Sequence, residues 1–285
     1  MKTVNSLSGG MTSSYIAKNY KADYNIFALV TTIDKKCIYP DKKVRQLISD
    51  KIGREFIGTL EDDIIINTIL DLEQFIGQEI NFVAGKPFDE IIQRGSNKKL
   101  YLPNVTQRFC TTEMKLQPLF DWWLKNIGEP VEMRIGFRAN EMSRAKTMIS
   151  KTNSNGLLEF KSIIGKTKTG NSNKWKSFEW QKPKFPLIED GIFKDSIMKY
   201  WKHKPVRFAY MNNCIGCFHR NEVLLKFMSE RYPNKFNWFI EQEGKGYKRR
   251  TFKNGVTYQQ IKDSFKQISL FDEDFNECDS GYCGL

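Results

Sequence analysis

Short apolar runs alternate with amphipathic segments through the first half of the chain, and this pattern predicts its secondary structure. The apolar runs predict strands over 3–7, 25–33, 79–83 and 131–136. Helical spacing predicts helices over 41–52, 62–75 and 115–125, and a first helix that begins near Ser14 and ends near Tyr20. Because strands and helices follow each other in turn, we expect an α/β fold with a parallel sheet flanked by helices.

A polar, lysine-rich stretch interrupts this pattern between residues 150 and 176. Its content of Ser, Thr, Asn, Gly and Lys predicts a flexible loop, either a lid over an anionic substrate or a plain surface insertion. Beyond it, helices are predicted over 195–201 and 221–231. We therefore divide the chain into an α/β domain over 1–205, with a flexible basic insertion at 150–180, and a cysteine-bearing C-terminal extension over 206–285.

The composition narrows the class of protein. The 285 residues are 40% hydrophobic and 27% charged, which is enough for a sizeable core. No stretch approaches the ~20 apolar residues of a membrane span, and the N-terminus lacks the apolar core of a signal peptide, so we expect a cytoplasmic protein without a membrane partner. The formal charge of +12 favours a polyanionic partner such as nucleic acid or nucleotides, although lysines spread over a solvated surface are the alternative explanation.

The segment SGGMTS, residues 8–13, joins the first predicted strand to the first predicted helix. Gly9 and Gly10 let the backbone pass close to an anion, and the start of a helix presents N–H groups and the positive end of its dipole. Hydroxyl groups at Ser8 and Ser13 add further donors. The segment predicts a phosphate-binding loop, and a chance serine-glycine turn is the alternative.

The cysteines are Cys37, Cys110, Cys214, Cys217, Cys278 and Cys283. In a cytoplasmic chain they argue against a disulfide framework and for metal or redox chemistry. The C-x-x-C turn and the two cysteines of the tail could form a four-thiolate zinc site, whereas adding Cys110 would suit an iron–sulfur cluster beside the phosphate-binding loop. A helix start and the nearby Arg108 and Lys115 predict a lowered pKa for the Cys110 thiol. Cys37 is assigned no role.

The segment RIGFRANEMSR, residues 134–144, follows the last strand predicted for the first half of the chain. That strand ends at Gly136 and releases Arg138, Glu141 and Arg144 at the carboxyl edge of the sheet, where ligands bind in open α/β folds. Arginine forks match phosphate or sulfate oxygens in pairs. The segment predicts an anion-binding loop, with a solvated charged loop as the alternative.

Taken in order, these blocks resemble the PP-loop ATP-pyrophosphatase superfamily and, within it, the phosphoadenosine phosphosulfate (PAPS) reductase-like family, which includes phage-encoded members. The resemblance covers most of the chain, through SGGMTSSYIAKNY, GKPFDEII to LPNVTQRFCTTEMKLQPLFDWW, IGFRANEMSRA, FPLIEDG to YWKHKPV, NNCIGCFHRNE and ECDSGYCGL. It implies a Rossmann-like (HUP-type) fold that binds an adenine nucleotide across the carboxyl ends of the first strands.

The resemblance also implies roles for single residues. The implied nucleotide-binding residues are Ser8, Gly9, Gly10, Thr12, Ser13, Arg108, Arg138, Glu141 and Arg144. Lys115 would hold substrate phosphate or sulfate together with the arginine of the R-x-C-T-x-x-x-K block. The implied ligands of a [4Fe–4S] cluster are Cys110, Cys214 and Cys217.

The chain departs from the family pattern in three places. Many superfamily members carry Lys-Asp where this chain has Met-Thr at 11–12, so a carboxylate that could assist Mg²⁺ is absent. Cys110 is followed by threonine where reductases with a cluster have a Cys-Cys pair. The tail ends in Cys-Gly-Leu, without the glutamate and histidine of assimilatory reductases. Either Cys278 or Cys283 would complete the cluster; we take Cys278 as the ligand and Cys283, with Lys115, as catalytic.

We expect an enzyme in which a substrate oxygen attacks the α-phosphate of ATP, pyrophosphate leaves, and a sulfur or nitrogen nucleophile attacks the adenylate, with Mg²⁺ stabilising the phosphates. A sulfonucleotide reductase, in which a thiolate attacks PAPS and sulfite is released, is the alternative. A non-catalytic nucleic-acid-binding or regulatory protein on the same fold is the alternative from another class. The second substrate is not identified, and nucleic acid is one candidate. Zinc is the alternative to iron in the metal site. A phage-encoded protein would work in the host cytoplasm.

Overall fold

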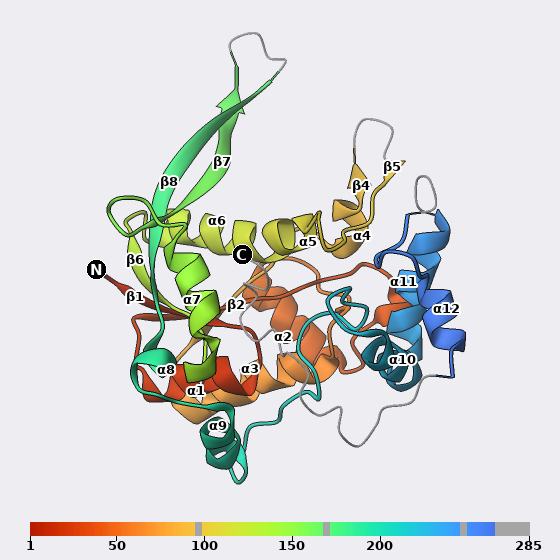
Figure 1. Ribbon diagram of the computed structural model, residues 1–285, viewed down its shortest axis with the longest axis horizontal. Coiled ribbons are helices and arrows are strands. Elements are labelled where there is room, and N and C mark those ends of the chain that lie inside the picture. Colours follow the sequence, from red (N-terminus) through yellow and green to blue (C-terminus); the bar gives the residue numbers. More distant parts are fainter. Residues whose placement is uncertain (95–98, 168–171, 246–249, 266–285) are drawn as a thin grey trace.

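A six-stranded sheet forms the centre of the molecule in the computed structural model (Figure 1). The structure describes residues 1–94, 99–167, 172–245 and 250–265. The sheet has the strand order β3-β2-β1-β6-β8-β7. Its strands are β1 (Thr3–Leu7), β2 (Tyr24–Ala28), β3 (Ile80–Val83), β6 (Val131–Arg134), β7 (Leu158–Lys166) and β8 (Asn173–Lys184). Neighbouring strands are parallel except β7, which runs antiparallel to β8. The predicted α/β class is confirmed, and the sheet is compatible with a Rossmann-like fold.

Helices flank this sheet and fill the connections between its strands. The α-helices are α1 (Met11–Asn19), α2 (Lys42–Ile52), α3 (Asp63–Ile76), α4 (Phe88–Ile91), α5 (Phe109–Thr111), α6 (Gln117–Asn126), α7 (Met142–Ile149), α8 (Pro186–Glu189), α9 (Lys194–Trp201), α10 (Glu222–Arg231), α11 (Pro233–Lys245) and α12 (Tyr258–Asp263). A π-helical turn (Thr112–Leu116) joins α5 to α6, and two 3₁₀ turns cover Lys35–Cys37 and Ala139–Glu141. A small hairpin, β4 (Gln93–Arg94) and β5 (Lys99–Leu100), stands apart from the sheet.

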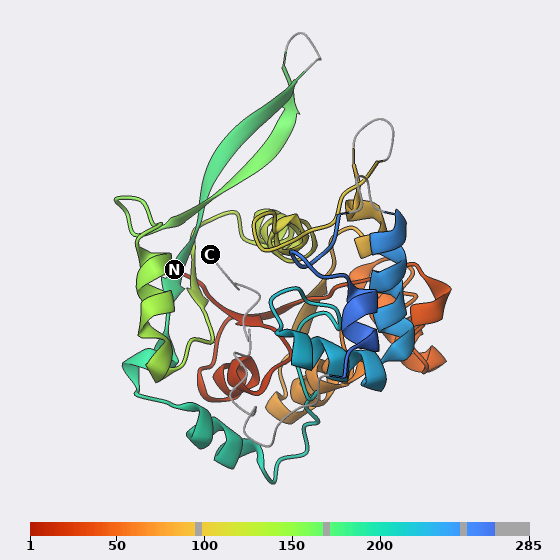
Figure 2. The ribbon, with the colours of Figure 1, turned by 45° about the vertical axis from the view of Figure 1, so that its right-hand side comes forward.

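The two faces of the sheet are covered by different apolar clusters because successive residues of a strand point to opposite faces. Phe27 of β2 packs with Ile65 and Ile69 of α3 on one face. Its neighbour Ile26 packs with Phe120 of α6 on the other. Figure 2 shows α1 and α6 on opposite sides of the sheet. The sheet is therefore the middle layer of three, as in open α/β folds.

A third apolar cluster joins the C-terminal helices to the rest of the molecule. Phe236 and Phe239 of α11 pack with Tyr258 of α12, and the cluster extends to Phe88 of α4 and Met114 of the π-helical turn. Sequence reasoning predicted only α10 among these three helices. The apolar residues of α11 form a stripe at helical spacing, which could have indicated a second helix. However, the stripe contains few residues, and α11 begins only one residue after α10 ends, so the two helices are hard to separate in the sequence.

The segment predicted as a flexible loop contains a long hairpin instead, so that prediction is wrong over 158–166 and 173–180. Phe160 and Phe178 lie opposite each other in the hairpin and both rings contact Phe120, with centroid distances of 4.5 and 5.3 Å. Strand β8 then continues into the sheet and pairs with β6. Apolar and polar residues alternate only at the base of the hairpin, at Leu158 and Phe160 and at Phe178 and Trp180, so the composition of the rest predicts a loop.

Two predicted boundaries also move. The strand predicted over 25–33 ends at Ala28, because its neighbour β3 ends at Val83 and the last bond runs from Leu29 N–H to the Val83 carbonyl. The first helix begins at Met11 and not near Ser14, since the Gly10 carbonyl already accepts a bond from the Ser14 N–H at 3.0 Å.

Candidate functional site

The order of the strands creates a switch point at the carboxyl ends of β1 and β6. From β1 the chain moves outward through β2 to β3 on one side, and β6 lies on the other side of β1. Loops that leave two such strands diverge, and in open α/β sheets ligands bind in the crevice between them. The two loops here, residues 8–10 and 135–138, carry predicted nucleotide-binding residues.

Gly9 determines the path of the loop after β1. Its φ of +78° lies in the left-handed region. A Cβ atom at this position would lie 2.5 Å from Cγ2 of Ile65 on α3. Glycine is therefore required both by the dihedral angle and by the close approach of the backbone to α3. Phosphate-binding loops depend on backbone conformations of this kind.

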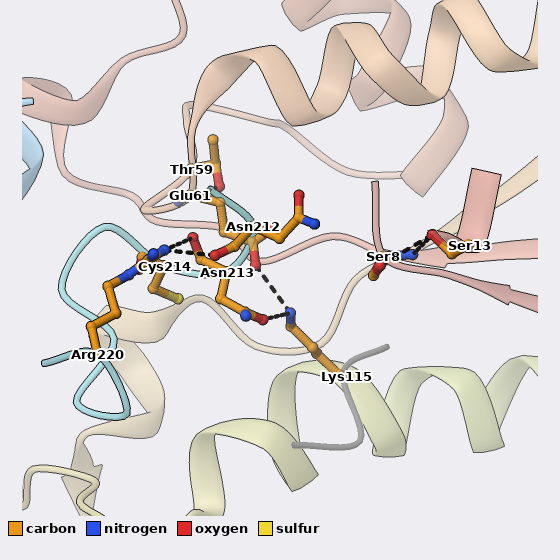
Figure 3. A network of polar contacts seen from close by, with 9 residues as sticks. All are labelled: Ser8, Ser13, Thr59, Glu61, Lys115, Asn212, Asn213, Cys214 and Arg220. Carbon is orange, nitrogen blue, oxygen red and sulfur yellow. Dashed lines mark hydrogen bonds and ion pairs between the residues drawn. The ribbon is translucent and has the colours of Figure 1, made fainter. Parts of the chain in front are cut away.

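The serines of the loop are joined to each other, and Figure 3 shows this pair. The Ser13 hydroxyl accepts a hydrogen bond from the Ser8 N–H at 3.1 Å and lies 3.1 Å from the Ser8 hydroxyl. It also lies 3.2 Å from the Gly10 carbonyl, to which it can donate. Gly10 is the N-cap of α1 and has no side chain to cap the helix. The positive end of the α1 dipole therefore faces the loop without a side-chain cap from that residue.

The loop after β6 packs directly on the first turn of α1. A Cβ atom at Gly136 would lie 3.3 Å from Cγ2 of Thr12 and 3.6 Å from the Ser13 nitrogen. Thr12 is buried. The structure thus brings the two predicted nucleotide-binding segments, 8–13 and 134–144, together at one edge of the sheet.

Glu141 joins the two arginines of the second loop. The Arg138 backbone N–H and Nε donate to Oε2 of Glu141 at 2.9 and 3.0 Å, and Arg144 donates to Oε1. The Arg144 guanidinium lies over the Phe137 ring, 4.3 Å from its centroid. Two positive charges and one negative charge leave a net positive charge beside the crevice. The predicted triad of Arg138, Glu141 and Arg144 is a cluster in space, and its role in binding stays a prediction.

Three of the predicted metal ligands line one cavity of about 50 Å³. Its cysteines are Cys110 at α5 and Cys214 and Cys217 of the turn before α10. The apolar side chains of the lining are Phe88, Met114, Phe218, Phe239 and Phe252, and its polar side chains include Arg108, Lys115 and His219. The cavity lies between α5 and the third apolar cluster, so distant parts of the chain bring these thiols together.

The backbone of the C-x-x-C turn is held from several sides. The Cys217 N–H donates to the Cys214 carbonyl at 3.1 Å, and the buried Arg220 donates to the carbonyls of 212, 213 and 214. Gly216 is needed because a Cβ atom there would lie 2.5 Å from the Phe239 ring. The turn is therefore fixed before any ligand binds, which is the condition for a preorganised metal or redox site.

Lys115 reaches from the π-helical turn to the C-x-x-C turn (Figure 3). Its Nζ lies 3.0 Å from Glu61 Oε1 and 3.4 Å from the Asn213 side-chain oxygen. Burial alone would lower the pKa of Lys115, but the Glu61 carboxylate and the neighbouring Cys214 raise it overall. Lys115 therefore keeps its positive charge next to the cysteines at neutral pH.

The pKa values of the cavity thiols are raised, whereas a lowered pKa was predicted for Cys110. Burial raises the pKa of Cys110 to about 11, with a further contribution from the nearby Cys217. These effects outweigh the lowering by Arg108, so the predicted low pKa is wrong. Burial and the Glu61 carboxylate raise the pKa of Cys214 well above its usual range. Both thiols are protonated at neutral pH in the metal-free protein, and metal binding would have to displace these protons.

Two basic side chains complete the cavity. Arg108 Nε is buried and has no hydrogen-bond partner in the described structure, and burial lowers the pKa of this guanidinium. Partial burial and the charges of Arg108 and Lys253 lower the pKa of His219 to about 4, so this imidazole is neutral at neutral pH. An orphaned donor on the wall of a cavity is the kind of group that a bound anion or a sulfur ligand would satisfy.

Sequence reasoning missed Glu61, which connects the two parts of the site. Its carboxylate contacts Lys115, and four residues further on Ile65 contacts Gly9. Its carbonyl oxygen accepts a hydrogen bond from Lys235 at 2.7 Å. The acidic run Glu-Asp-Asp before α3 resembles an ordinary helix start, so no local signal sets Glu61 apart.

Cys278 and Cys283 lie outside the described residues, so their predicted roles are not placed. In the described ranges, no group of three or more His, Cys, Asp or Glu side chains is arranged to hold a metal ion. Cys37 is buried in the apolar core, and it is not among the residues that line the cavity.

Comparison of this chain with known proteins finds no matching family model, no matching curated protein and no matching solved structure. None of the helices in the described part of the chain has the length and apolar character needed to cross a membrane.

Proposed function

We propose that this protein is an enzyme that uses an adenine nucleotide to activate a second substrate by adenylation, with release of pyrophosphate. The proposal is carried by the loop over 8–13. This loop lies at the carboxyl end of the central strand β1, at the N-terminus of α1 and at the switch point of the sheet. Each of these three positions favours a bound phosphate for a separate physical reason.

In the proposed reaction an oxygen of the second substrate attacks the α-phosphorus of ATP. The bond from that phosphorus to the bridging oxygen breaks, and pyrophosphate leaves toward the 8–13 loop. The N-terminus of α1 and the net positive charge of the Arg138–Glu141–Arg144 cluster offset the negative charge that develops. Mg²⁺ would enter with the phosphates, because the loop itself offers no carboxylate. A sulfur nucleophile attacking the adenylate would make the enzyme a sulfurtransferase.

Cys110, Cys214 and Cys217 are proposed to hold an iron–sulfur cluster, which when bound supplies electron-transfer or sulfur chemistry. Support comes from the three thiols that line one cavity and from the buried, unpartnered Nε of Arg108 beside them. A single zinc ion held by the same thiolates is the alternative. Cys278 would be the fourth ligand.

A pair of product assays tests the reaction. Anaerobically purified protein is incubated with ATP or with PAPS, with and without added tRNA or DNA, and released pyrophosphate and sulfite are measured. Pyrophosphate from ATP supports adenylation. Sulfite from PAPS would support the sulfonucleotide reductase instead, with Cys283 as its predicted nucleophile.

The variant Gly10→Val tests the nucleotide site. The φ and ψ of Gly10 are −95° and 164°, which valine adopts without backbone strain. Because Gly10 is buried, circular dichroism is used to verify that the variant is folded. The isopropyl group would cover the N-terminus of α1 and weaken ATP binding at least tenfold, measured by isothermal titration calorimetry. Gly244→Val adds the same side chain to α11, where nothing lies within 4 Å of a Cβ atom, and is the matched control. An unchanged ATP affinity in Gly10→Val would remove the basis of the proposed site.

A further inference from the structure

The β7–β8 hairpin projects from the sheet well beyond the helices that cover it (Figures 1 and 2). Its base is anchored by Phe160, Phe178 and Trp180, which pack on α6. Beyond this base, 161–166 and 173–177 are exposed at almost every position. We call this exposed part of the hairpin the arm. Most of its side chains do not contribute to the apolar core.

The arm is strongly basic. Between Phe160 and Phe178 the sequence has no aspartate or glutamate and carries Lys161, Lys166, Lys168, Lys174 and Lys176. All of these lysines that the structure describes are exposed. Part of the formal charge of +12 is thus concentrated on one projecting element. This distribution differs from the alternative explanation, in which lysines are spread evenly over a solvated surface.

An exposed tryptophan stands in the middle of these lysines. Trp175 is 59% exposed, and its partner directly across the hairpin, Ile163, is 48% exposed. Lys161 lies on the same face, two residues along the strand from Ile163. Trp175 is not part of the cluster that anchors the base. A large aromatic side chain of this kind is costly to leave in water, so the surface is suited to binding a partner.

We propose that the distal arm, residues 161–166 and 173–177, binds single-stranded nucleic acid. The lysines would contact phosphates, and the Trp175 ring would stack on a base. A single strand is favoured over a duplex because stacking on Trp175 requires an open base face, which a duplex buries between neighbouring pairs. The proposal does not depend on the nucleotide site, which lies at the carboxyl ends of β1 and β6.

A membrane surface also attracts basic segments that carry tryptophan and isoleucine. Insertion of a hairpin would place apolar residues at its apex. Here the connection over 167–172 has the sequence TKTGNS, without an apolar side chain, and the exposed apolar residues lie further back along the strands. The charge and the position of Trp175 therefore favour a nucleic acid.

Fluorescence polarisation with a fluorescein-labelled oligothymidylate of about 20 nucleotides tests the proposal on the full chain. We expect Trp175→Ala to weaken binding roughly 5- to 150-fold, with little change in its salt dependence, and Trp175→Phe to restore most of the loss. Lys174→Gln/Lys176→Gln should weaken binding and reduce the slope of log K against log salt by up to about 1.4. Lys42→Gln/Lys43→Gln, which removes the same charge from exposed positions on α2, is the matched control.

Several results would overturn the proposal. The first is an affinity of Trp175→Ala equal to that of the unaltered protein, and the second is a loss of affinity in the α2 control as large as that in Lys174→Gln/Lys176→Gln. The third is an equal affinity for a duplex of the same length. The fourth is binding to phosphatidylserine vesicles but not to the oligonucleotide. Thermal melting by circular dichroism confirms that each variant is folded, as expected for exposed positions. Gly10→Val should leave oligonucleotide binding unchanged, so failure of the arm and failure of the nucleotide site are separable.

Discussion

Replacing Gly9 by alanine tests whether the loop after β1 has the geometry described. The substitution forces a side chain onto a residue with φ of +78°, which costs about 1–2 kcal/mol. It also places a Cβ atom 2.5 Å from Cγ2 of the buried Ile65, and crowding of a packed core typically costs about 1–3 kcal/mol. We expect Gly9→Ala to lower the free energy of unfolding by about 2–5 kcal/mol, a large part of the total for a natural domain.

Gly77→Ala is the matched control. Gly77 ends α3 with φ of +64°, and nothing lies within 4 Å of a Cβ atom at this position. It therefore reports the cost of the dihedral angle alone. Urea unfolding is followed by tryptophan fluorescence and by far-ultraviolet circular dichroism, and coincident transitions justify a two-state free energy. The difference between the two variants isolates the contact with Ile65.

A double-mutant cycle decides the cause. Ile65→Ala alone should cost about 2–5 kcal/mol because it leaves a cavity. In the Gly9→Ala background it also removes the clashing methyl group, so the double variant should be less destabilised than the sum by about 1–3 kcal/mol. Additive effects, or a Gly9→Ala variant no less stable than Gly77→Ala, would refute the close approach of the loop to α3.

Two further predictions concern the cysteine cavity and a surface ion pair. Anaerobically purified Cys214→Ser should lose its iron, measured by metal analysis and absorption, whereas Cys37→Ala should keep it; stoichiometric zinc without iron in the unaltered protein would contradict the cluster. Arg207 lowers the pKa of Asp71 by hydrogen bonding, so the stabilisation from this pair is complete above the unfolded pKa of about 3.9 and is lost as the pH falls through the folded value. Because Arg207 is 63% exposed, we expect Asp71→Asn to be only about 0.2–1 kcal/mol less stable at pH 7, and a deficit in the urea midpoint that does not shrink as the pH is lowered from 7 to 3 would contradict the assignment.

The sequence predicted the parts of the fold that depend on local periodicity. The strand over 3–7 is observed with the predicted bounds, and the helices over 41–52 and 62–75 are observed to within one residue at each end. Each has a buried apolar face repeated at its own period, so a short window contains the information. The β7–β8 hairpin was missed because its distal half has no buried face. Only Phe160, Phe178 and Trp180, at the base of the hairpin, indicate a strand, and they are buried by contact with α6, some 40 to 60 residues earlier in the chain.

The site was predicted as a set of residues but not as a geometry. Glycines after a strand and arginines after another strand indicated which segments meet at the edge of the sheet, because parallel strands share a carboxyl edge. The pKa of Cys110 could not be predicted, since the position before a helix argues for a lowered value. Burial raises this pKa instead. The burial depends on Phe239 and Phe252, which lie more than a hundred residues later in the chain.

The connection before α3 contacts both parts of the candidate site. The Leu60 carbonyl accepts a hydrogen bond from Ile215 of the C-x-x-C turn at 2.8 Å, and Glu61 pairs with Lys115. Ile65 then fixes the backbone at Gly9. The Glu61 side chain is only 3% exposed, and breaking a buried ion pair costs about 3–5 kcal/mol, so this connection resists displacement. We therefore expect that a change at the cysteines that moved residue 60 would reach the 8–13 loop through a segment of a few residues.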